Sequence, residues 1–141
     1  SSNIPPEYMS DIGQRIDIYQ RLSKIKSSDD WVEIRDELYD RFGELPDPVK
    51  NLLYINRVVS IAKELNLKSI IRKKNKAFLT FIYDIGGAKK ALQKSLTSSV
   101  LIGSNRLTIN FSEDSKSWKE ELLDLLMRLQ EFNKKFHIEI I

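Results

Sequence analysis

Apolar residues recur at helical spacing through roughly the first 65 residues of the chain and at strand spacing beyond them. In the stretch WVEIRDELYDRFGELPDP, positions placed at about 100° per residue separate into two faces. The apolar face consists of Trp31, Ile34, Leu38 and Phe42. This pattern predicts a helix from about Asp29 to Phe42 whose apolar stripe turns inward.

Capping residues delimit this helix. A short side-chain oxygen at Ser28 or Asp29 can accept a hydrogen bond from a first-turn N–H, which predicts the N-cap there. Gly43 tolerates the left-handed backbone that ends many helices. Asp47-Pro48 predicts the start of a further helix, with Asp47 as N-cap and Pro48 at the first helical position.

Two more helices are predicted on either side of this one. The first runs from about Ile12 to Lys26, capped by Ser10 or Asp11, and the third runs from about Pro48 to Leu65. The inward residues expected for the first are Ile12, Ile16, Tyr19 and Leu22 or Ser23, and those expected for the third are Leu52, Ile55, Val59 and Ala62. The first half of the chain is therefore predicted to be a three-helix segment.

The second half changes period and is rich in β-branched and aromatic residues. Strands are predicted at 68–74 and 77–83, joined by a turn at Asn75-Lys76, and again at 99–102 and 106–111. A short helix is predicted at 88–96, and a long C-terminal helix is predicted at about 115–136. The tail 137–141 is expected either to fray or to add an edge strand. The predicted fold class is α+β, with a small, mainly antiparallel sheet.

Composition narrows the function. The chain has 141 residues, one histidine and no cysteine. One domain is expected over residues 7–141, with residues 1–6 a linker or cloning remnant. Without cysteine, and with His137 near the end, the sequence offers no thiolate metal site and no place for a nucleophile–histidine pair. We expect no cofactor, no metal, no membrane span and no catalytic site, and a cytoplasmic location.

The polar face of the 29–42 helix is the first candidate for binding a partner. It carries Glu33, Glu37, Asp40 and Arg41. Glu37 and Arg41 form a favourable i,i+4 pair worth roughly 0.2–0.5 kcal/mol, and the like charges of Glu33 and Glu37 cost a similar amount. Local charge pairing therefore gives this face no clear stability. A solvated surface and an acidic docking face for a basic partner both remain open.

A basic stretch is the alternative candidate. The net charge of +3 is uneven, because residues 1–60 carry 8 basic and 11 acidic side chains and residues 61–141 carry 15 and 9. The basic side chains of the first predicted hairpin are Lys68, Arg72, Lys73, Lys74 and Lys76. Such residues with aromatics between them can bind single-stranded nucleic acid. Phe78 and Phe81, however, are three residues apart and fall on opposite sides of a strand.

Two motifs in the first half resemble a known family. EYMSDIGQRIDIYQRL covers residues 7–22, and DELYDRFGELPDPVKNLL covers residues 36–53. Both resemble the C-terminal domain of the bacterial transcription-repair coupling factor (Mfd) family. The positions that align with the family pattern are Tyr8, Met9, Asp11, Arg15, Tyr19, Arg21, Glu37, Leu38, Asp40, Arg41, Phe42, Gly43, Leu45, Pro46, Pro48, Leu52 and Leu53. Met9 and Gln20 are mild departures from the family pattern, and the match is looser after about residue 65.

The resemblance implies a regulatory role. Proteins of this family are ATP-driven DNA translocases that push stalled RNA polymerase off damaged DNA and recruit UvrA. Their C-terminal domain packs on the N-terminal UvrB-like module of the same protein and covers its UvrA-binding surface. Glu37, Asp40 and Arg41 match positions on the helix that makes this contact. The implied partners are therefore the UvrB-like module directly, and UvrA, RNA polymerase and DNA through the parent protein.

Overall fold

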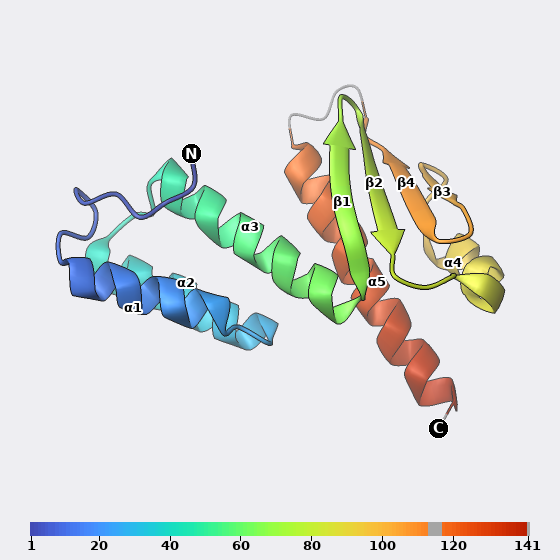
Figure 1. Cartoon of the computed structure of the whole chain (residues 1–141), viewed down its shortest axis with the longest axis horizontal. Coiled ribbons are helices and arrows are strands. Elements are labelled where there is room, and N and C mark those ends of the chain that lie inside the picture. Colours follow the sequence, from blue (N-terminus) through green and yellow to red (C-terminus); the bar gives the residue numbers. More distant parts are fainter. Residues whose placement is uncertain (113–116, 141) are drawn as a thin grey trace. The chain divides into compact units, whose positions relative to one another are not determined.

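The computed structural model describes residues 1–112 and 117–140, and in the last helix it describes side chains up to residue 135. The chain divides into two compact units, Ser1–Ser60 and Ile61–Ile141. Helix α3 (Asp47–Glu64), drawn in Figure 1, contains residues of both units because the boundary falls after Ser60. The single domain expected over residues 7–141 stays a prediction, and the two units are described separately below.

Unit 1 contains α1 (Ile12–Ser23), α2 (Ser28–Phe42) and most of α3. The Asp11 side chain accepts hydrogen bonds from the N–H groups of Gly13 and Gln14, so it is the N-cap of α1, one of the two residues predicted. Gly43, with a φ of 88°, ends α2 as predicted. Capping chemistry therefore located these two boundaries from sequence alone.

Two predicted caps were wrong by one residue. The N-cap of α2 is Ser27, whose side chain accepts from the N–H of Asp30 at 3.2 Å. In α3, the carbonyl of Pro46 accepts from the N–H of Lys50, so Asp47 lies within the first turn instead of capping it. Neighbouring Ser and Asp residues offer near-equivalent caps, and the final choice depends on where the preceding loop leaves the backbone.

The core of unit 1 confirms the inward face predicted for α2. Ile34 and Leu38 are buried, and Trp31 and Phe42 pack against the same cluster. The other buried members are Ile4, Met9, Ile18, Leu22, Val49 and Leu53. Ile4 belongs to the segment expected to be a linker, and it is 3% exposed. Residues 1–6 therefore pack on unit 1.

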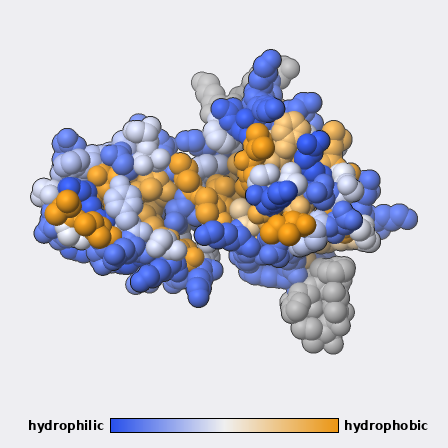
Figure 2. All heavy atoms as spheres, in the orientation of Figure 1, coloured by the Kyte–Doolittle hydropathy of each residue, from blue (hydrophilic) through white to orange (hydrophobic). Residues whose placement is uncertain are grey.

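The inward faces predicted for α1 and α3 were only partly right: Leu22 is buried and Leu52 packs against the core, but the other large apolar residues predicted to face inward do not. On α1, Ile18 and Leu22 are buried, whereas Ile12, Ile16 and Tyr19 are exposed. On α3, Val49 and Leu53 are buried, whereas Ile55 and Val59 are exposed. Both helices carry two apolar stripes, and packing against the α2 core decided which one is buried. Figure 2 shows orange, apolar surface among the blue.

Unit 2 is built on a four-stranded sheet of β1 (Leu67–Lys73), β2 (Lys76–Phe81), β3 (Val100–Ile102) and β4 (Arg106–Asn110). The strand order is β1-β2-β4-β3, and every neighbouring pair is antiparallel. This confirms the α+β class and the antiparallel sheet. The first hairpin turn lies at Lys74-Asn75, one residue earlier than predicted, because Lys73 pairs with Lys76.

Helices complete unit 2. A short 3₁₀ turn, η1 (Gly86–Ala88), leads into α4 (Lys89–Ser95), and α5 (Trp118–Ile140) passes behind the sheet in Figure 1. The edge strand considered for the tail was wrong, since residues 137–140 continue α5. The predicted start of this helix at 115 lies outside the described residues. One side of the sheet is buried, with Ala77, Leu79 and Leu107 fully inaccessible.

Across the described ranges, none of the helices combines the length and the apolar character that crossing a membrane requires.

Candidate interaction surface on helix α2

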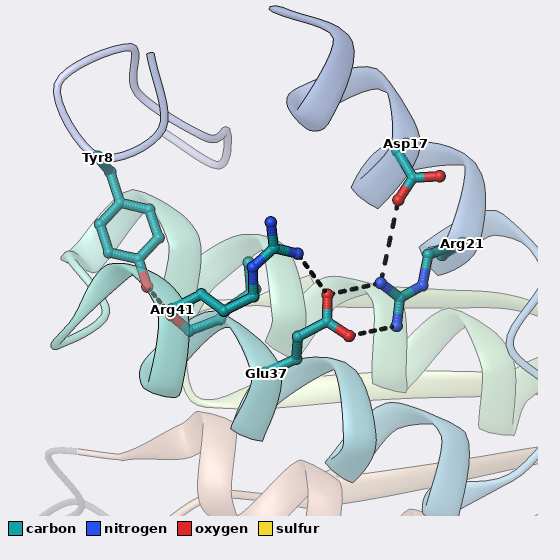
Figure 3. Close-up of polar contacts among 6 residues, drawn as sticks. Tyr8, Asp17, Arg21, Glu37 and Arg41 are labelled. Carbon is teal, nitrogen blue, oxygen red and sulfur yellow. Dashed lines mark hydrogen bonds and ion pairs between the residues drawn. The ribbon is translucent and has the colours of Figure 1, made fainter. Parts of the chain in front are cut away.

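Glu37 lies at the centre of an ion cluster that joins α2 to α1 (Figure 3). Its Oε2 accepts a hydrogen bond from Nη1 of Arg21 at 2.8 Å, and its Oε1 accepts one from Nη2 at 3.1 Å. Nη1 of Arg41, one turn further along α2, donates to Oε2 at 3.3 Å. The paired contact from Arg21 is the planar, bidentate geometry that makes arginine–carboxylate pairs strong and directional.

Asp17 extends the cluster along α1. Its Oδ2 lies 4.0 Å from Nη1 of Arg21. We refer to Asp17, Arg21, Glu37 and Arg41 as the Glu37 cluster. Two carboxylates and two guanidinium groups make it electrically neutral, and the Glu37 side chain keeps only 28% of its surface exposed. Glu37 is therefore occupied mainly by contacts inside unit 1.

The cluster shifts the ionisation of its central pair. The hydrogen bonds from Arg21 hold the pKa of the Glu37 carboxyl below its ordinary value, even though partial burial acts in the opposite direction. The same bonds raise the pKa of the Arg21 guanidinium. Each side chain thus favours the charged form of the other, as expected for a hydrogen-bonded pair of opposite charges.

The other predicted contact residues lie on the same helix but differ in their surroundings. Glu33, Asp40 and Arg41 are exposed. Arg41 contacts Glu37 and lies over the Phe42 ring at 5.2 Å. Within the described part of the chain, Asp40 makes no hydrogen bond or ion pair. The acidic residues of this part of the motif are Asp36, Glu37 and Asp40. Asp36 and Glu37 form ion pairs within unit 1, whereas Asp40 forms none among the described residues.

Most other motif residues have structural roles inside unit 1. The Tyr8 hydroxyl donates to the carbonyl of Leu38 at 2.9 Å and lies 3.0 Å from the carbonyl of Gly43, and so it ties the N-terminal segment to the end of α2. Nη1 of Arg15 donates to the carbonyl of Met9 at 2.7 Å. The Tyr8 contacts join segments 30 and 35 residues apart in the sequence, which explains why a helical pattern alone did not reveal them.

Arg21 is the functional residue that the sequence analysis missed. It was matched to the family motif, but nothing in the helical pattern of either helix indicates that it meets Glu37, sixteen residues away. The available signal was charge: Arg21 and Arg15 are the basic residues of the first motif, and α2 is rich in carboxylates. A cross-helix pair is a reasonable expectation where two such helices lie antiparallel with a short connection.

A groove adjoins the cluster between the start of α1 and the end of α2. Its volume is about 330 Å³. The lining residues are Met9, Asp11, Gly13, Gln14, Asp17, Ile18, Arg41 and Phe42. The lining combines apolar side chains with two carboxylates and the Arg41 guanidinium, so the groove could cover the methylene stem of a long polar side chain.

The alternative basic patch is divided by the sheet. Lys73 and Lys76 are cross-strand partners, and Lys74 lies in the turn. Arg72 points to the covered side of the sheet, where its guanidinium lies 4.3 Å from the centre of the Trp118 ring. Lys68 is exposed at an irregularity of β1. The five residues therefore do not form one surface. Within the described residues, no group of three or more potential ligands could hold a metal.

Comparisons with known proteins agree on one relationship. The family model described as the TRCF domain matches residues 1–90. The transcription-repair-coupling factor of Escherichia coli K12 is 36% identical over 69 residues, which cover 49% of this chain and 6% of that protein. That of Buchnera aphidicola is 31% identical over 121 residues, which cover 86% of this chain and 13% of that protein. The chain thus spans a small part of these curated relatives.

A solved structure extends the similarity to the whole chain. The crystal structure of the C-terminal domain of a transcription-repair coupling factor superposes with a TM-score of 0.72 at 26% identity. The match covers 95% of this chain and 89% of that one. The similarity in fold therefore includes unit 2, where the sequence motifs are weak.

Proposed function

This chain belongs to the TRCF domain family of transcription-repair coupling factors, and from that premise we propose that it is a regulatory, non-catalytic interaction domain. It binds the UvrB-like N-terminal module of its own parent protein and masks the surface to which UvrA binds. The parent is an ATP-driven translocase of the bacterial cytoplasm that acts on DNA and stalled RNA polymerase. Release of the domain exposes the UvrA-binding surface.

One observation carries this proposal. Asp40 is exposed on α2 within the motif, and no group in the described part of the chain uses its carboxylate. Glu37 and Leu38 in the same motif make contacts inside unit 1, whereas Asp40 makes no hydrogen bond or ion pair within the described residues. An exposed carboxylate without a partner in the described residues supports docking of a basic surface.

The energetics suit a reversible lock. A contact formed by a few exposed charges contributes only about 0.2–1 kcal/mol for each pair. A closed state held by several such contacts can be opened by a second ligand whose differential affinity is a few kcal/mol. Glu33, Asp40 and Arg41 supply such contacts, and Glu37 orients Arg41 through the hydrogen bond between them.

Asp40→Lys tests the proposal without disturbing the Glu37 cluster. Binding of this chain to the purified UvrB-like module, measured by titration calorimetry, should weaken about tenfold at low salt, because an attraction becomes a repulsion. Asp84→Lys is the matched control, since Asp84 is also exposed and lies in unit 2. Equal affinities for Asp40→Lys and the unaltered chain would show that this face of α2 is not the docking surface.

A further inference from the structure

The four strands of unit 2 have a one-sided charge composition. They contain Lys68, Arg72, Lys73, Lys76 and Arg106, and no aspartate or glutamate. Strand pairing assigns these side chains to different faces. The covered face carries Ala77, Leu79 and Leu107, so the residues that alternate with them along each strand form the opposite, open face.

Strand register arranges the open face in three rows. The central row crosses all four strands and consists of Ile71, Phe78, Thr108 and Leu101. One flanking row consists of Lys73, Lys76 and Asn110, and the other consists of Ser69, Thr80 and Arg106. A row of mainly apolar side chains is therefore bordered on both sides by cations.

The open face is accessible to solvent. Ile71 and Leu101, at the two ends of the central row, are 49% and 60% exposed, and Phe78 between them is half-buried. Lys73, Lys76 and Arg106 are all exposed. Orange and blue spheres lie side by side over the sheet in Figure 2. Single apolar residues scattered over a surface are normal, whereas a contiguous row of exposed apolar side chains is typical of an interaction site.

Phe78 and Arg106 form the centre of this face. The Arg106 guanidinium lies 5.0 Å from the centroid of the Phe78 ring. Their strands pair directly, with Arg106 opposite Thr80 and Phe78 opposite Thr108. The Phe78 ring and the Arg106 guanidinium that lies over it form a stacked pair against which a flat base can stack, and the guanidinium can also contact a phosphate.

We propose that the open face of this sheet binds a short single strand of nucleic acid. One base stacks on Phe78, and the backbone phosphates lie near Lys73 and Lys76 on one side and Arg106 on the other. Four strands spaced about 4.8 Å apart give a platform about 14 Å wide, enough for two or three nucleotides. Thr80, Thr108 and Asn110 add neutral hydrogen-bonding groups.

The chemistry of the face favours this occupant over the alternatives. A duplex keeps its bases stacked inside, so it would meet the cations but leave the ring and the central row without a partner. An acidic peptide would pair with the lysines and Arg106, but its carboxylates would gain nothing from Phe78. Only a single strand matches both the cationic borders and the aromatic centre.

This site differs from the basic hairpin suggested by sequence. Arg72 belongs to the covered side, over Trp118, so it is not part of the platform. Arg106 comes from β4, 25 residues after the hairpin ends at Phe81, and joins the face only because β4 pairs with β2.

The test uses the 141-residue chain and a fluorescein-labelled oligothymidylate of about 12 nucleotides, with anisotropy as the readout. We expect a Kd of about 10⁻⁵ M at 50 mM salt, weakening roughly 20-fold at 200 mM as three phosphate contacts are screened. Phe78→Leu should weaken binding about tenfold, because a leucine cannot stack with a base. Arg106→Gln should weaken binding and flatten the salt dependence by about 0.7 in the log–log slope.

Lys90→Gln is the matched control, because Lys90 is an exposed cation of α4 and lies off the sheet. It should bind as the unaltered chain does, and circular dichroism should show that all three variants are folded. The proposal is overturned if neither Phe78→Leu nor Arg106→Gln weakens binding, if Lys90→Gln weakens it equally, or if a matched duplex binds as tightly. Tighter binding of polyglutamate than of the oligonucleotide would assign the face to an acidic protein instead.

Discussion

Unit 1 and unit 2 are stabilised internally by different kinds of contact. In unit 1, polar side chains bond to backbone carbonyls on other segments: Nε1 of Trp31 donates to Leu53 at 2.9 Å, and Nδ2 of Asn56 donates to Leu22 at 2.8 Å. In unit 2, a backbone ladder joins the strands, and the buried side is leucine, isoleucine, alanine and phenylalanine. Unit 1 therefore depends on particular polar groups, and unit 2 depends on an alternating pattern.

This difference explains why the two halves carry unequal sequence signals. Few residue types could replace Tyr8, because its hydroxyl must reach the carbonyls of both Leu38 and Gly43. An inward strand position can be filled by any of several apolar residues of similar volume. The residues that carry the family resemblance lie between positions 7 and 53, inside unit 1. Unit 2 can keep the same fold with a less distinctive sequence.

Core truncation should have the largest effect and should separate the units. Leu38→Ala and Leu79→Ala each remove a side chain that is essentially inaccessible, at a cost of about 3 kcal/mol. The chain has two tryptophans, Trp31 in unit 1 and Trp118 in unit 2. In a variant that keeps only Trp31, we expect Leu38→Ala to lower the denaturant midpoint measured by tryptophan fluorescence. In a variant that keeps only Trp118, we expect Leu79→Ala to lower the corresponding midpoint.

The comparison between the units would fail if each substitution shifted both midpoints equally. That result would mean that the shared helix α3 couples the two cores into one cooperative transition. Ile71→Ala, at a half-exposed position on the open face of the sheet, serves as the surface control and should shift either midpoint much less.

Removing a single polar tie should have an intermediate effect. Tyr8→Phe deletes the hydroxyl that contacts the carbonyls of Leu38 and Gly43, and it should cost about 1–2 kcal/mol in urea unfolding. Tyr39→Phe makes the same chemical change at an exposed site on α2 and should cost almost nothing. Equal stabilities for the two variants would show that the hydrogen bonds of the Tyr8 hydroxyl do not stabilise unit 1.

Neutralising Glu37 should have the smallest effect and should depend on pH. Because Arg21 lowers the pKa of Glu37 in the folded chain, the charged carboxylate stabilises unit 1 above its ordinary pKa of 4.5. This contribution is lost as the pH falls through the lowered folded-state value. Glu37→Gln should therefore be less stable than the unaltered chain by about 1 kcal/mol at neutral pH.

The stability difference between the unaltered chain and Glu37→Gln should shrink as the pH falls below 4.5 and through the lowered folded-state pKa of Glu37, because the carboxyl is then protonated and neutral. Thermal unfolding at a series of pH values measures it. Glu33→Gln removes an exposed acid from the same helix and should show little difference at any pH. A Glu37→Gln effect that stays constant with pH would mean that the ion cluster does not stabilise the fold.

The sequence predicted what depends on neighbours within a few residues. Asp11 and Gly43 delimit helices because capping involves the adjacent turn, and the α2 core stripe follows from helical spacing. The same reasoning was only partly right on α1 and α3, because both stripes satisfy helical periodicity. Only the neighbouring helices distinguish them.

The sequence by itself therefore determined the element order, the α+β class and the acidic face of α2. The tertiary structure decided that Glu37 binds Arg21, that Asp40 has no partner within the described residues, and that Arg106 joins Phe78 on one face of the sheet. Periodicity and capping report forces that act over one or two turns. A pair of side chains brought together by packing depends on helix and strand partners that no local pattern specifies.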